Sequence, residues 1–361
     1  MNKNRPTRIQ ESNWQKPAPW RAARGKMQRE PFCLPDLPNP TCFVPSGVDA
    51  LHQTVKETAR STPDTDVSVQ RRRMAFGRLE GLSAAASLRD HWPEYLMEVG
   101  ESGAYLLAAC MVATLLQHPG SIVQQTVSSN IARRTLIGLA LGATTIAIVT
   151  SPWGKRSGGH FNPAITLTFY RLGKVEFWDA WFYVIAQFVG AIGGACLARL
   201  ALHGALGHQA VRYAVTVPGM YGSAVAFVAE LAISFILMIT VLFTTNSKGL
   251  APYTAYFVGV LIAAYFIFEA PLSGMSTNPA RTFGSALHAN HWHALWIYFI
   301  APSFGMLAAA EIFLRVRGAA PYCGKLHHAN SQRCIFHHTQ QQVSFREKVI
   351  HSEQAQKGKV A

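Results

Sequence analysis

The sequence predicts an all-α membrane protein with six transmembrane helices and two re-entrant half helices, arranged as an inverted repeat. Three observations predict this fold. The region between His91 and Gly318, about 225 residues, consists mostly of Ala, Leu, Ile, Val, Phe and Gly, whereas basic residues gather outside it. This region holds six apolar segments of roughly the 20 residues that a helix needs to cross a bilayer. It also holds two shorter apolar segments that begin with the same tripeptide, Asn-Pro-Ala.

Two polar tails flank the apolar region. Of the 33 Lys and Arg residues, fifteen lie before His91 and six lie after Gly318. Residues 1–91 are rich in Pro, Arg, Ser and Thr without sustained periodicity, so we expect a basic and largely disordered tail. They contain no apolar segment typical of a secretory signal, and Met27 and Met74 are alternative starts of the chain. No nucleic-acid-binding motif accompanies the net charge of +14, which favours attraction to an anionic membrane surface over binding of nucleic acid.

The six apolar segments are predicted to cross the membrane as helices. Prolines mark the ends of several of them, because proline interrupts the hydrogen bonding of a helix. The predicted spans are approximately residues 95–117, 134–151, 178–201, 222–245, 251–270 and 292–316.

The two shorter segments, Asn162–Leu172 and Asn278–Ala289, can reach only halfway across. At 1.5 Å per residue, each helix would cover about half of a 30 Å bilayer. Asparagine is favoured as a helix N-cap and proline at the first helical position, so each Asn-Pro-Ala predicts an abrupt helix start. Gly173 and Asn290 are suitable residues to end the two helices. The non-helical backbone before each half helix must be buried in protein or line a water-filled cavity.

The apolar region repeats its own pattern. Glu98 opens the first span and Glu230 opens the fourth, and each is followed two spans later by an Asn-Pro-Ala half helix. The repeats cover about residues 92–201 and 222–317, and each contains three spans and one half helix. Because three is an odd number, the second copy is inverted relative to the first, an arrangement that recurs in proteins that move solutes through membranes.

These residues resemble the aquaporin, or major intrinsic protein, family. The resemblance rests on the two Asn-Pro-Ala boxes, on Glu98 and Glu230, and on the residues beside the boxes, which are Gly159-His160, Arg281 and Phe283-Gly284. It extends over about residues 94–317 and assigns a channel domain to residues 92–317. It implies a passive channel without a cofactor or catalytic group. It further implies a homotetramer in the cell membrane with both termini in the cytoplasm.

The resemblance places the two boxes, Asn162-Pro163-Ala164 and Asn278-Pro279-Ala280, face to face at the centre of a channel. An N-cap asparagine accepts backbone N–H groups with its side-chain oxygen, which leaves the NH₂ group free to donate. A water molecule that accepts from both asparagines cannot relay protons along a hydrogen-bonded file. The positive ends of two helix dipoles add an electrostatic barrier to cations.

The resemblance also implies a constriction made by four residues. Arg281 is one, Met275 and Phe266 are two more, and the fourth lies near Leu141 or Gly142 on the second span. The loop after that span, SPWGKRS, is about one residue longer than is usual in the family. We assign the fourth position to Gly142. The alternative for the arginine is a side chain that extends toward the membrane surface from a helix end.

The loops before the half helices have predicted support residues. Glu98 and Glu230 resemble buried glutamates of the family that accept hydrogen bonds from these loops, and His160 belongs to the same support. Glu101 is a less suitable alternative to Glu98. Two buried carboxylates also raise the alternative of a hydrolase, which is disfavoured because the spans contain no nucleophile–base arrangement or metal-ligand spacing.

The sequence favours water as the solute, with glycerol or another small neutral solute as the alternative. Strict water filters of the family carry histidine where this chain has Phe266, which favours the alternative. Glycerol facilitators usually have Asp directly after the arginine and non-aromatic residues early in the sixth span. This chain has Thr282, Tyr298 and Phe299 at those places, and Ala286 also matches the water-channel pattern. A second alternative is a structural membrane scaffold with a vestigial pore.

The C-terminal tail, residues 318–361, is basic and rich in Cys and His. Cys323, His327, Cys334 and His337 have a C-x₃-H…C-x₂-H spacing that predicts a possible Zn²⁺ site. The alternative is a histidine-rich tail without a ligand. Basic residues in the predicted inside loops agree with cytoplasmic termini, although Arg133 and Arg134 on the first outside loop do not. Those inside residues are Lys155, Arg156, Lys174 and Lys248.

Overall fold

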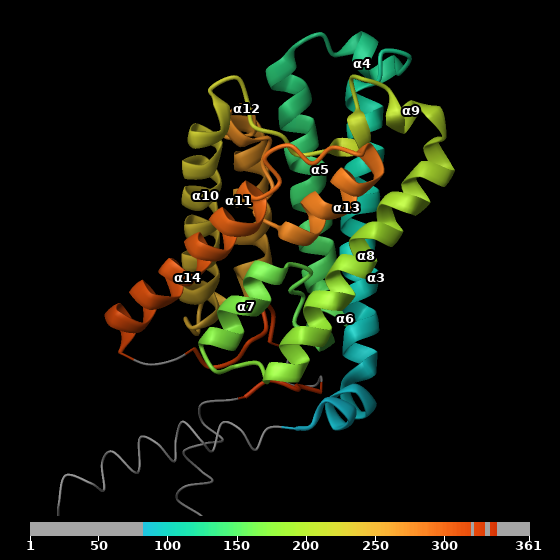
Figure 1. Ribbon diagram of the computed structural model, residues 1–361. Helices are drawn as coiled ribbons and strands as arrows, with labels where there is room; N and C mark the ends of the chain where they lie inside the picture. The colour runs from blue at the N-terminus through green and yellow to red at the C-terminus, as the bar shows by residue number, and fades with distance from the viewer. Residues whose placement is uncertain (1–81, 319–320, 329–332, 338–361) are drawn as a thin grey trace, which may run out of the picture. The chain divides into compact units, whose positions relative to one another are not determined.

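The computed structural model describes residues 82–318, 321–328 and 333–337, and these residues form helices and connecting segments without any strand (Figure 1). Six of the helices are long and apolar enough to cross a membrane, so the predicted all-α fold with six spans is confirmed. Predictions for the first 81 residues and for the rest of the C-terminal tail lie outside the described residues. The six helices are α3 (Ala84–Gln117), α5 (Asn130–Thr150), α8 (Phe177–Leu202), α10 (Gly222–Thr245), α11 (Thr254–Phe268) and α14 (Ile297–Arg317).

The first long helix, α3, begins about eleven residues earlier than predicted. Ser83 caps it by accepting a hydrogen bond from the backbone N–H of Ala86 at 3.3 Å. The helix then continues through Pro93, although proline usually marks a helix boundary. Residues 84–91 are therefore the beginning of a helix, and the N-terminal tail expected over residues 1–91 is shorter than the sequence suggested.

Both half helices form where the sequence predicts them. α7 (Pro163–Arg171) has nine residues and α13 (Pro279–Ala289) has eleven, which correspond to about 14 and 17 Å of helix. Asn162 and Asn278 are the N-caps, and Asn290 ends α13 in the left-handed conformation with φ 47°. Short elements connect the longer ones: α4 (Ile122–Thr126), α6 (Pro152–Ser157), α9 (Gly204–Gly207), α12 (Ala270–Ser273) and two 3₁₀ turns, η2 (Arg212–Ala214) and η3 (Ala251–Tyr253).

The packing of the long helices follows the predicted inverted repeat. In the first repeat α3 packs against α8, in the second α10 packs against α14, and the two middle helices, α5 and α11, pack against each other across the repeats. We call the end of the bundle where α3 begins and α14 ends the tail end. α6 and the C-terminus of α7 lie at the tail end, whereas α12 lies at the opposite end (Figure 1).

In each of these three helix pairs, a glycine allows the two backbones to approach closely. A Cβ atom on Gly194 would lie 2.2 Å from the carbonyl oxygen of Gly103, between α8 and α3. Corresponding distances are 2.4 Å from Gly305 to the carbonyl oxygen of Leu231 and 2.4 Å from Gly142 to that of Gly259. Small residues on α8, α14 and α5 therefore allow helices of the same chain to approach closely, as small residues commonly do in membranes.

The outward faces of the long helices carry large apolar side chains. Exposed examples occur on all six helices, and several of these side chains are more than half exposed. Such surfaces suit hydrocarbon, whereas water-soluble monomers rarely expose large contiguous apolar patches. Among them are Leu200 on α8, Val228 on α10, Val260 and Phe268 on α11 and Phe304 on α14.

Candidate functional site

The two Asn-Pro-Ala turns have fixed side-chain geometry. The Oδ1 atom of Asn162 accepts the backbone N–H of Ala164 at 2.9 Å. The Oδ1 atom of Asn278 accepts the backbone N–H groups of Ala280 and Arg281 at 3.0 and 3.2 Å. These N-cap bonds orient each carboxamide so that its NH₂ group points away from its own half helix.

The two turns are also bonded to each other. The Nδ2 atom of Asn162 donates to the carbonyl oxygen of Thr277 at 2.8 Å, and that of Asn278 donates to the carbonyl oxygen of Phe161 at 2.8 Å. Phe161 and Thr277 have positive φ angles of 32° and 55°, which an ordinary residue rarely adopts. An amide NH₂ has two hydrogens, so each asparagine keeps one further donor after this reciprocal bonding.

Two buried glutamates hold the loops that lead to these turns. Glu98 accepts the backbone N–H groups of His160 and Phe161 at 3.0 and 2.7 Å. Glu230 accepts those of Ser276 and Thr277 at 2.6 and 2.8 Å. Each carboxylate therefore satisfies two donors that would otherwise be buried without a partner.

Neighbouring residues separate the roles of the two acids on the first helix. Glu101 accepts the hydroxyl of Ser157 at 2.8 Å, so it is Glu98 that binds the backbone of the loop. Gln187 on α8 completes the first site by donating to Glu98 at 2.7 Å.

A serine and a tyrosine extend the correspondence between the repeats, and sequence reasoning missed both pairs. The hydroxyl of Tyr183 donates to the carbonyl oxygen of Ser157, and that of Tyr298 donates to the carbonyl oxygen of Ser273, each at 2.6 Å. The hydroxyl oxygen of each serine accepts the backbone N–H two residues later at 3.0 Å. A Ser-Gly dipeptide five residues before each capping asparagine is the signal that could have found them.

Arg281 lies on the second half helix and is almost fully buried, with 6% of its surface exposed. Its Nη1 atom donates to the hydroxyl of Thr216, in the segment between α8 and α10. Thr282 donates to the same hydroxyl at 3.3 Å and lies 2.5 Å from the hydroxyl of Ser276. Among the ion pairs of the described residues none involves Arg281, and the hydroxyl of Thr216 is the side-chain partner shown for its guanidinium. Thr216 could not be found from the sequence, because only the fold brings it to the arginine.

The other three residues predicted to form the constriction differ in where the structure places them. Met275 and Phe266 are both buried, and Met275 has a positive φ angle of 55°. Gly142 faces α11, because a Cβ atom there would lie 2.4 Å from the carbonyl oxygen of Gly259. The assignment of Gly142 to the constriction is therefore wrong. Leu141 is fully buried and points about 100° away around the helix, which makes it the remaining candidate.

His160 joins the first loop to the C-terminal segment. Its Nδ1 atom lies 3.0 Å from the hydroxyl of Thr166, and its Nε2 atom lies 2.7 Å from the carbonyl oxygen of Gly324. The imidazole is stacked between the rings of Phe169 and Phe336, with centroids 5.2 and 5.4 Å away. The sequence placed the C-terminal tail outside the channel domain, whereas part of it contacts the loop that precedes Asn162.

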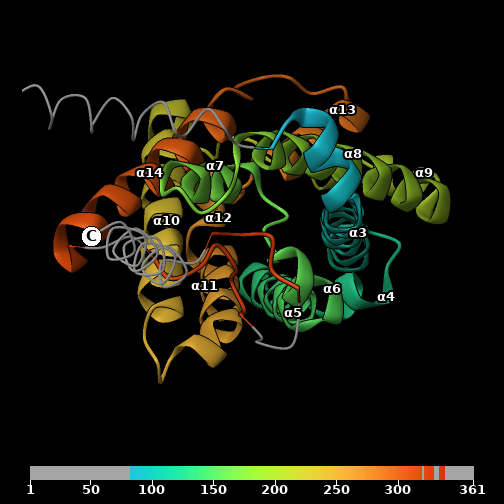
Figure 2. The same ribbon diagram turned by 90° about the horizontal axis from the view of Figure 1, so that it is seen from below.

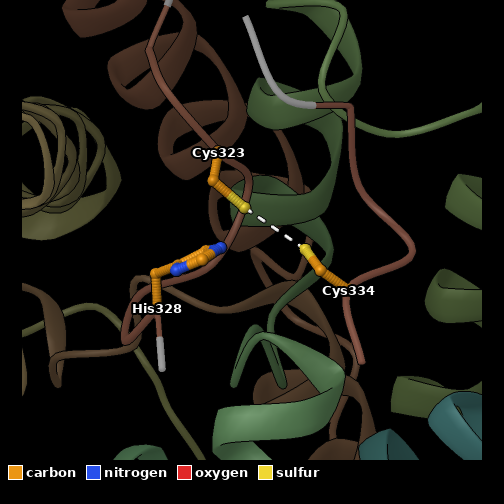
Figure 3. A group of neighbouring side chains, drawn as sticks. All are labelled: Cys323, His328 and Cys334. Carbon is orange, nitrogen blue, oxygen red and sulfur yellow. Dashed lines mark hydrogen bonds between the residues drawn. The ribbon is translucent and has the colours of Figure 1, made fainter. Parts of the chain in front are cut away.

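Three potential metal ligands meet in this C-terminal segment (Figure 3). The ligand atoms of Cys323, His328 and Cys334 lie within 4.8 Å of one another, and the two sulfur atoms are 3.5 Å apart. The sequence assigned His327 and His337 to this site, and the structure corrects both. His328 takes the place of its neighbour, and the Nε2 atom of His337 instead lies 2.5 Å from Glu176.

Comparison with known proteins gives one family. The model of the family described as major intrinsic protein matches residues 91–313. A glycerol uptake facilitator protein-like 6 from Lactiplantibacillus plantarum is 36% identical over 177 residues, which cover 48% of this chain and 81% of that protein. Aquaporin Z from Rhodopseudomonas palustris is 30% identical over 188 residues, covering 49% and 78%. Aquaporin-4 from Mus musculus is 33% identical over 184 residues, covering 49% and 55%.

Solved structures share the fold. The X-ray structure of the aquaglyceroporin from Plasmodium falciparum superposes with a TM-score of 0.53 at 18% identity. The match covers 62% of this chain and 96% of the aquaglyceroporin.

Proposed function

The chain belongs to the major intrinsic protein family of passive membrane channels, and from this premise we propose that it conducts water while excluding protons and ions. The chain is a multi-pass membrane protein and not an enzyme. Relatives named as aquaporins and as a glycerol facilitator stand at similar identity, so the choice of water depends on this chain's own residues.

The observation that carries the proposal is the reciprocal bonding of Asn162 and Asn278. Each carboxamide is fixed by its own half helix and by the opposite loop, and each retains one N–H donor. A water molecule that accepts from both donors has its own hydrogens directed away from the centre. It cannot then accept a proton and pass it on, and the two helix N-termini oppose the passage of cations.

Arg281 supports exclusion of cations at a second point. Its guanidinium is a permanent charge, and its contact with Thr216 leaves further N–H donors available to a passing solute. Within the described part of the chain no carboxylate pairs with this buried arginine, and such a charge is costly in a membrane, which favours a functional role for it over a structural one.

The residues around Arg281 favour water over glycerol. Met275 and Phe266 are large and buried, which suits a narrow passage. Thr282 stands directly after the arginine, where an acidic residue is typical of glycerol facilitators, and it is bonded to Ser276 and Thr216. Glycerol is the second candidate, because the apolar side chains of Met275 and Phe266 would also suit the carbon backbone of that solute.

Permeability of reconstituted vesicles tests the proposal. We expect purified protein to raise the rate of osmotic shrinkage well above that of empty vesicles, with little glycerol uptake. Asn278→Asp should reduce water flow and weaken the exclusion of cations, because the fixed N–H donor is replaced by a carboxylate. Shrinkage equal to that of empty vesicles would contradict the channel proposal, and glycerol flux as fast as that of water would contradict the choice of solute.

A paired variant sharpens the choice of solute. Phe266→His should raise the ratio of water to glycerol permeability, because the proposed constriction then carries a second polar group besides Arg281. Phe268→His provides the control, since that side chain lies on the exposed face of the same helix.

We propose that the protein is a homotetramer in the cell membrane, with the tail end in the cytoplasm. The basic loop residues Lys155, Arg156 and Lys174 lie at the tail end, which agrees with the preference of basic residues for the inner side. Cross-linking of the purified protein tests the tetramer, and reporter fusions at the C-terminus test the orientation.

A further inference from the structure

The segment after α14 contacts the loop that leads to Asn162. Residues 321–328 and 333–337 cross the tail end of the bundle, between α7, α11 and α6 (Figure 2). The backbone N–H of Leu326 donates to the carbonyl oxygen of Gly158 at 3.0 Å, and the carbonyl oxygen of Gly324 lies 2.7 Å from the ring of His160. These contacts involve the loop that starts at the tail end and runs inward to the first capping asparagine.

This docked segment, residues 323–328 and 333–337, is buried to an unusual degree for a tail. Lys325 is 1% exposed, and its ammonium group donates to the carbonyl oxygens of Lys155 and Arg333 at 2.8 and 2.7 Å. Lysine is rarely buried without partners, so these two bonds indicate a specific position. Phe336 is also buried and lies against Gly158, where an added Cβ atom would be 2.8 Å from the phenyl ring.

The three potential ligands bracket the part of this segment that touches the loop. Cys323 and His328 lie on either side of residues 324–327, and Cys334 lies two residues before Phe336. In tetrahedral zinc sites the Zn–S distance is about 2.3 Å, which puts two sulfur ligands about 3.8 Å apart. The observed separation of 3.5 Å between the thiols therefore requires little movement to admit an ion.

We propose that Cys323, His328 and Cys334 bind a zinc ion and that the ion locks the docked segment over the tail-end mouth of the channel. Binding converts the two thiols to thiolates with release of two protons, and the imidazole binds through a neutral nitrogen. Water or another exchangeable ligand completes the tetrahedron. The ion then favours the docked state, because the three ligands meet only when the segment is in place.

Only the predicted effect of zinc on water permeability rests on the proposed function. If the chain conducts water, zinc should lower the permeability, because the docked segment covers the loop beside His160. The binding of zinc itself does not depend on what the channel conducts.

The first experiment measures zinc per chain in purified full-length protein after removal of unbound metal. About one zinc ion per chain is expected in the wild type. His328→Ala and the double variant Cys323→Ser/Cys334→Ser should bind less than a fifth of that amount. His327→Ala is the matched control for the histidine, and Cys196→Ser, an exposed cysteine on α8, is the control for the thiols. Equal zinc in His327→Ala and His328→Ala, or no zinc in the wild type, would overturn the proposal.

The second experiment measures docking and permeability with the same variants. With zinc bound, trypsin should cleave after Lys325 and Arg333 at least several-fold more slowly than after chelation, and the two controls should behave as the wild type. Water permeability should rise several-fold on chelation in the wild type and stay constant in the double variant. If zinc binds without any change in the rate of cleavage, the proposal that zinc holds the docked segment in place is wrong. If no variant conducts water, the proposed function fails, whereas zinc content and cleavage still decide the site.

Discussion

The two loops that lead to the half helices share one framework but carry different side chains. Both have a serine and a positive-φ glycine at the start, a tyrosine hydroxyl on the serine carbonyl, and two backbone N–H groups on a buried glutamate. Three residues after the capping asparagine, however, the first loop has Ile165 where the second has Arg281. Three residues before it, the first has Gly159 where the second has Met275.

This difference separates the residues that build the channel from those that select the solute. Equivalent residues hold the backbone in both repeats, so their removal should damage both repeats alike. Residues without an equivalent should change conduction and leave folding intact.

The largest effect is expected from the shared glutamates. Glu230→Ala leaves the backbone N–H groups of Ser276 and Thr277 buried without their acceptor. Each such group costs about 1–3 kcal/mol, so we expect a loss of about 2–6 kcal/mol in the free energy of unfolding. Glu98→Ala should have a comparable effect through His160 and Phe161. Thermal unfolding in detergent, together with the yield of folded protein, measures both.

A control for this pair is available in the first repeat. Glu101→Ala removes an acceptor from the hydroxyl of Ser157 but from no backbone group, so it should be less harmful than Glu98→Ala. A variant of Glu98 that is as stable as the wild type would contradict the shared framework.

The second effect concerns Arg281, which has no counterpart in the first repeat. Arg281→Val removes the buried charge, so we expect cation and glycerol leakage to rise several-fold with little loss of stability. Ile165→Val is the matched change at the equivalent position and should leave conduction within about a factor of two. Ion flux and solute uptake in vesicles measure both variants, and unchanged selectivity in Arg281→Val would show that the two loops do not differ in this way.

The third effect tests the symmetry with a smaller change. Tyr183→Phe and Tyr298→Phe each remove one hydroxyl from a serine carbonyl while keeping the ring. Loss of a single hydrogen bond of this kind lowers the free energy of unfolding by about 1 kcal/mol. The two variants should therefore lower the melting temperature by similar amounts, about 2–4 °C. A large fall in melting temperature for one variant alone would mean that the two hydrogen bonds contribute unequally to stability.

The sequence predicted most of the fold because membrane length and helix caps are local signals. Asn162 and Asn278 mark the starts of both half helices without any knowledge of tertiary contacts. The start of α3 was missed because the prediction followed the apolar segment from residue 95, whereas the helix begins earlier, after its N-cap Ser83.

Contacts between distant segments could not be predicted in this way. Thr216 reaches Arg281 only because the chain between α8 and α10 folds over the second half helix. Gly142 was assigned to the constriction by counting residues, which cannot tell which side of a helix faces α11. Similarly, spacing suggested four metal ligands, but only the fold distinguishes His328 from His327.

The smallest effect concerns a second difference between the loops, since the first is covered by the C-terminal segment at the tail end. The Nε2 atom of His337 lies 2.5 Å from Glu176, and this hydrogen bond raises the pKa of His337 above its usual value. The same bond lowers the pKa of Glu176. A histidine with a raised pKa stabilises the docked state fully below its unfolded value of about 6.5 and loses the effect as the pH rises through the folded value. The glutamate contributes above its unfolded value of about 4.3 and loses its effect as the pH falls through the folded value.

Docking of residues 333–337 should therefore be strongest between about pH 4.5 and 6.5 and weaken as the pH rises further. Hydrogen exchange of this segment in metal-free protein, corrected for the intrinsic effect of pH, measures the change. Because both side chains are partly exposed, we expect only a modest increase in exchange above pH 7. Glu176→Gln should remove the pH dependence, whereas His327→Ala should retain it. A pH dependence that survives Glu176→Gln would assign it to another group and leave this ion pair without a role in covering the first loop.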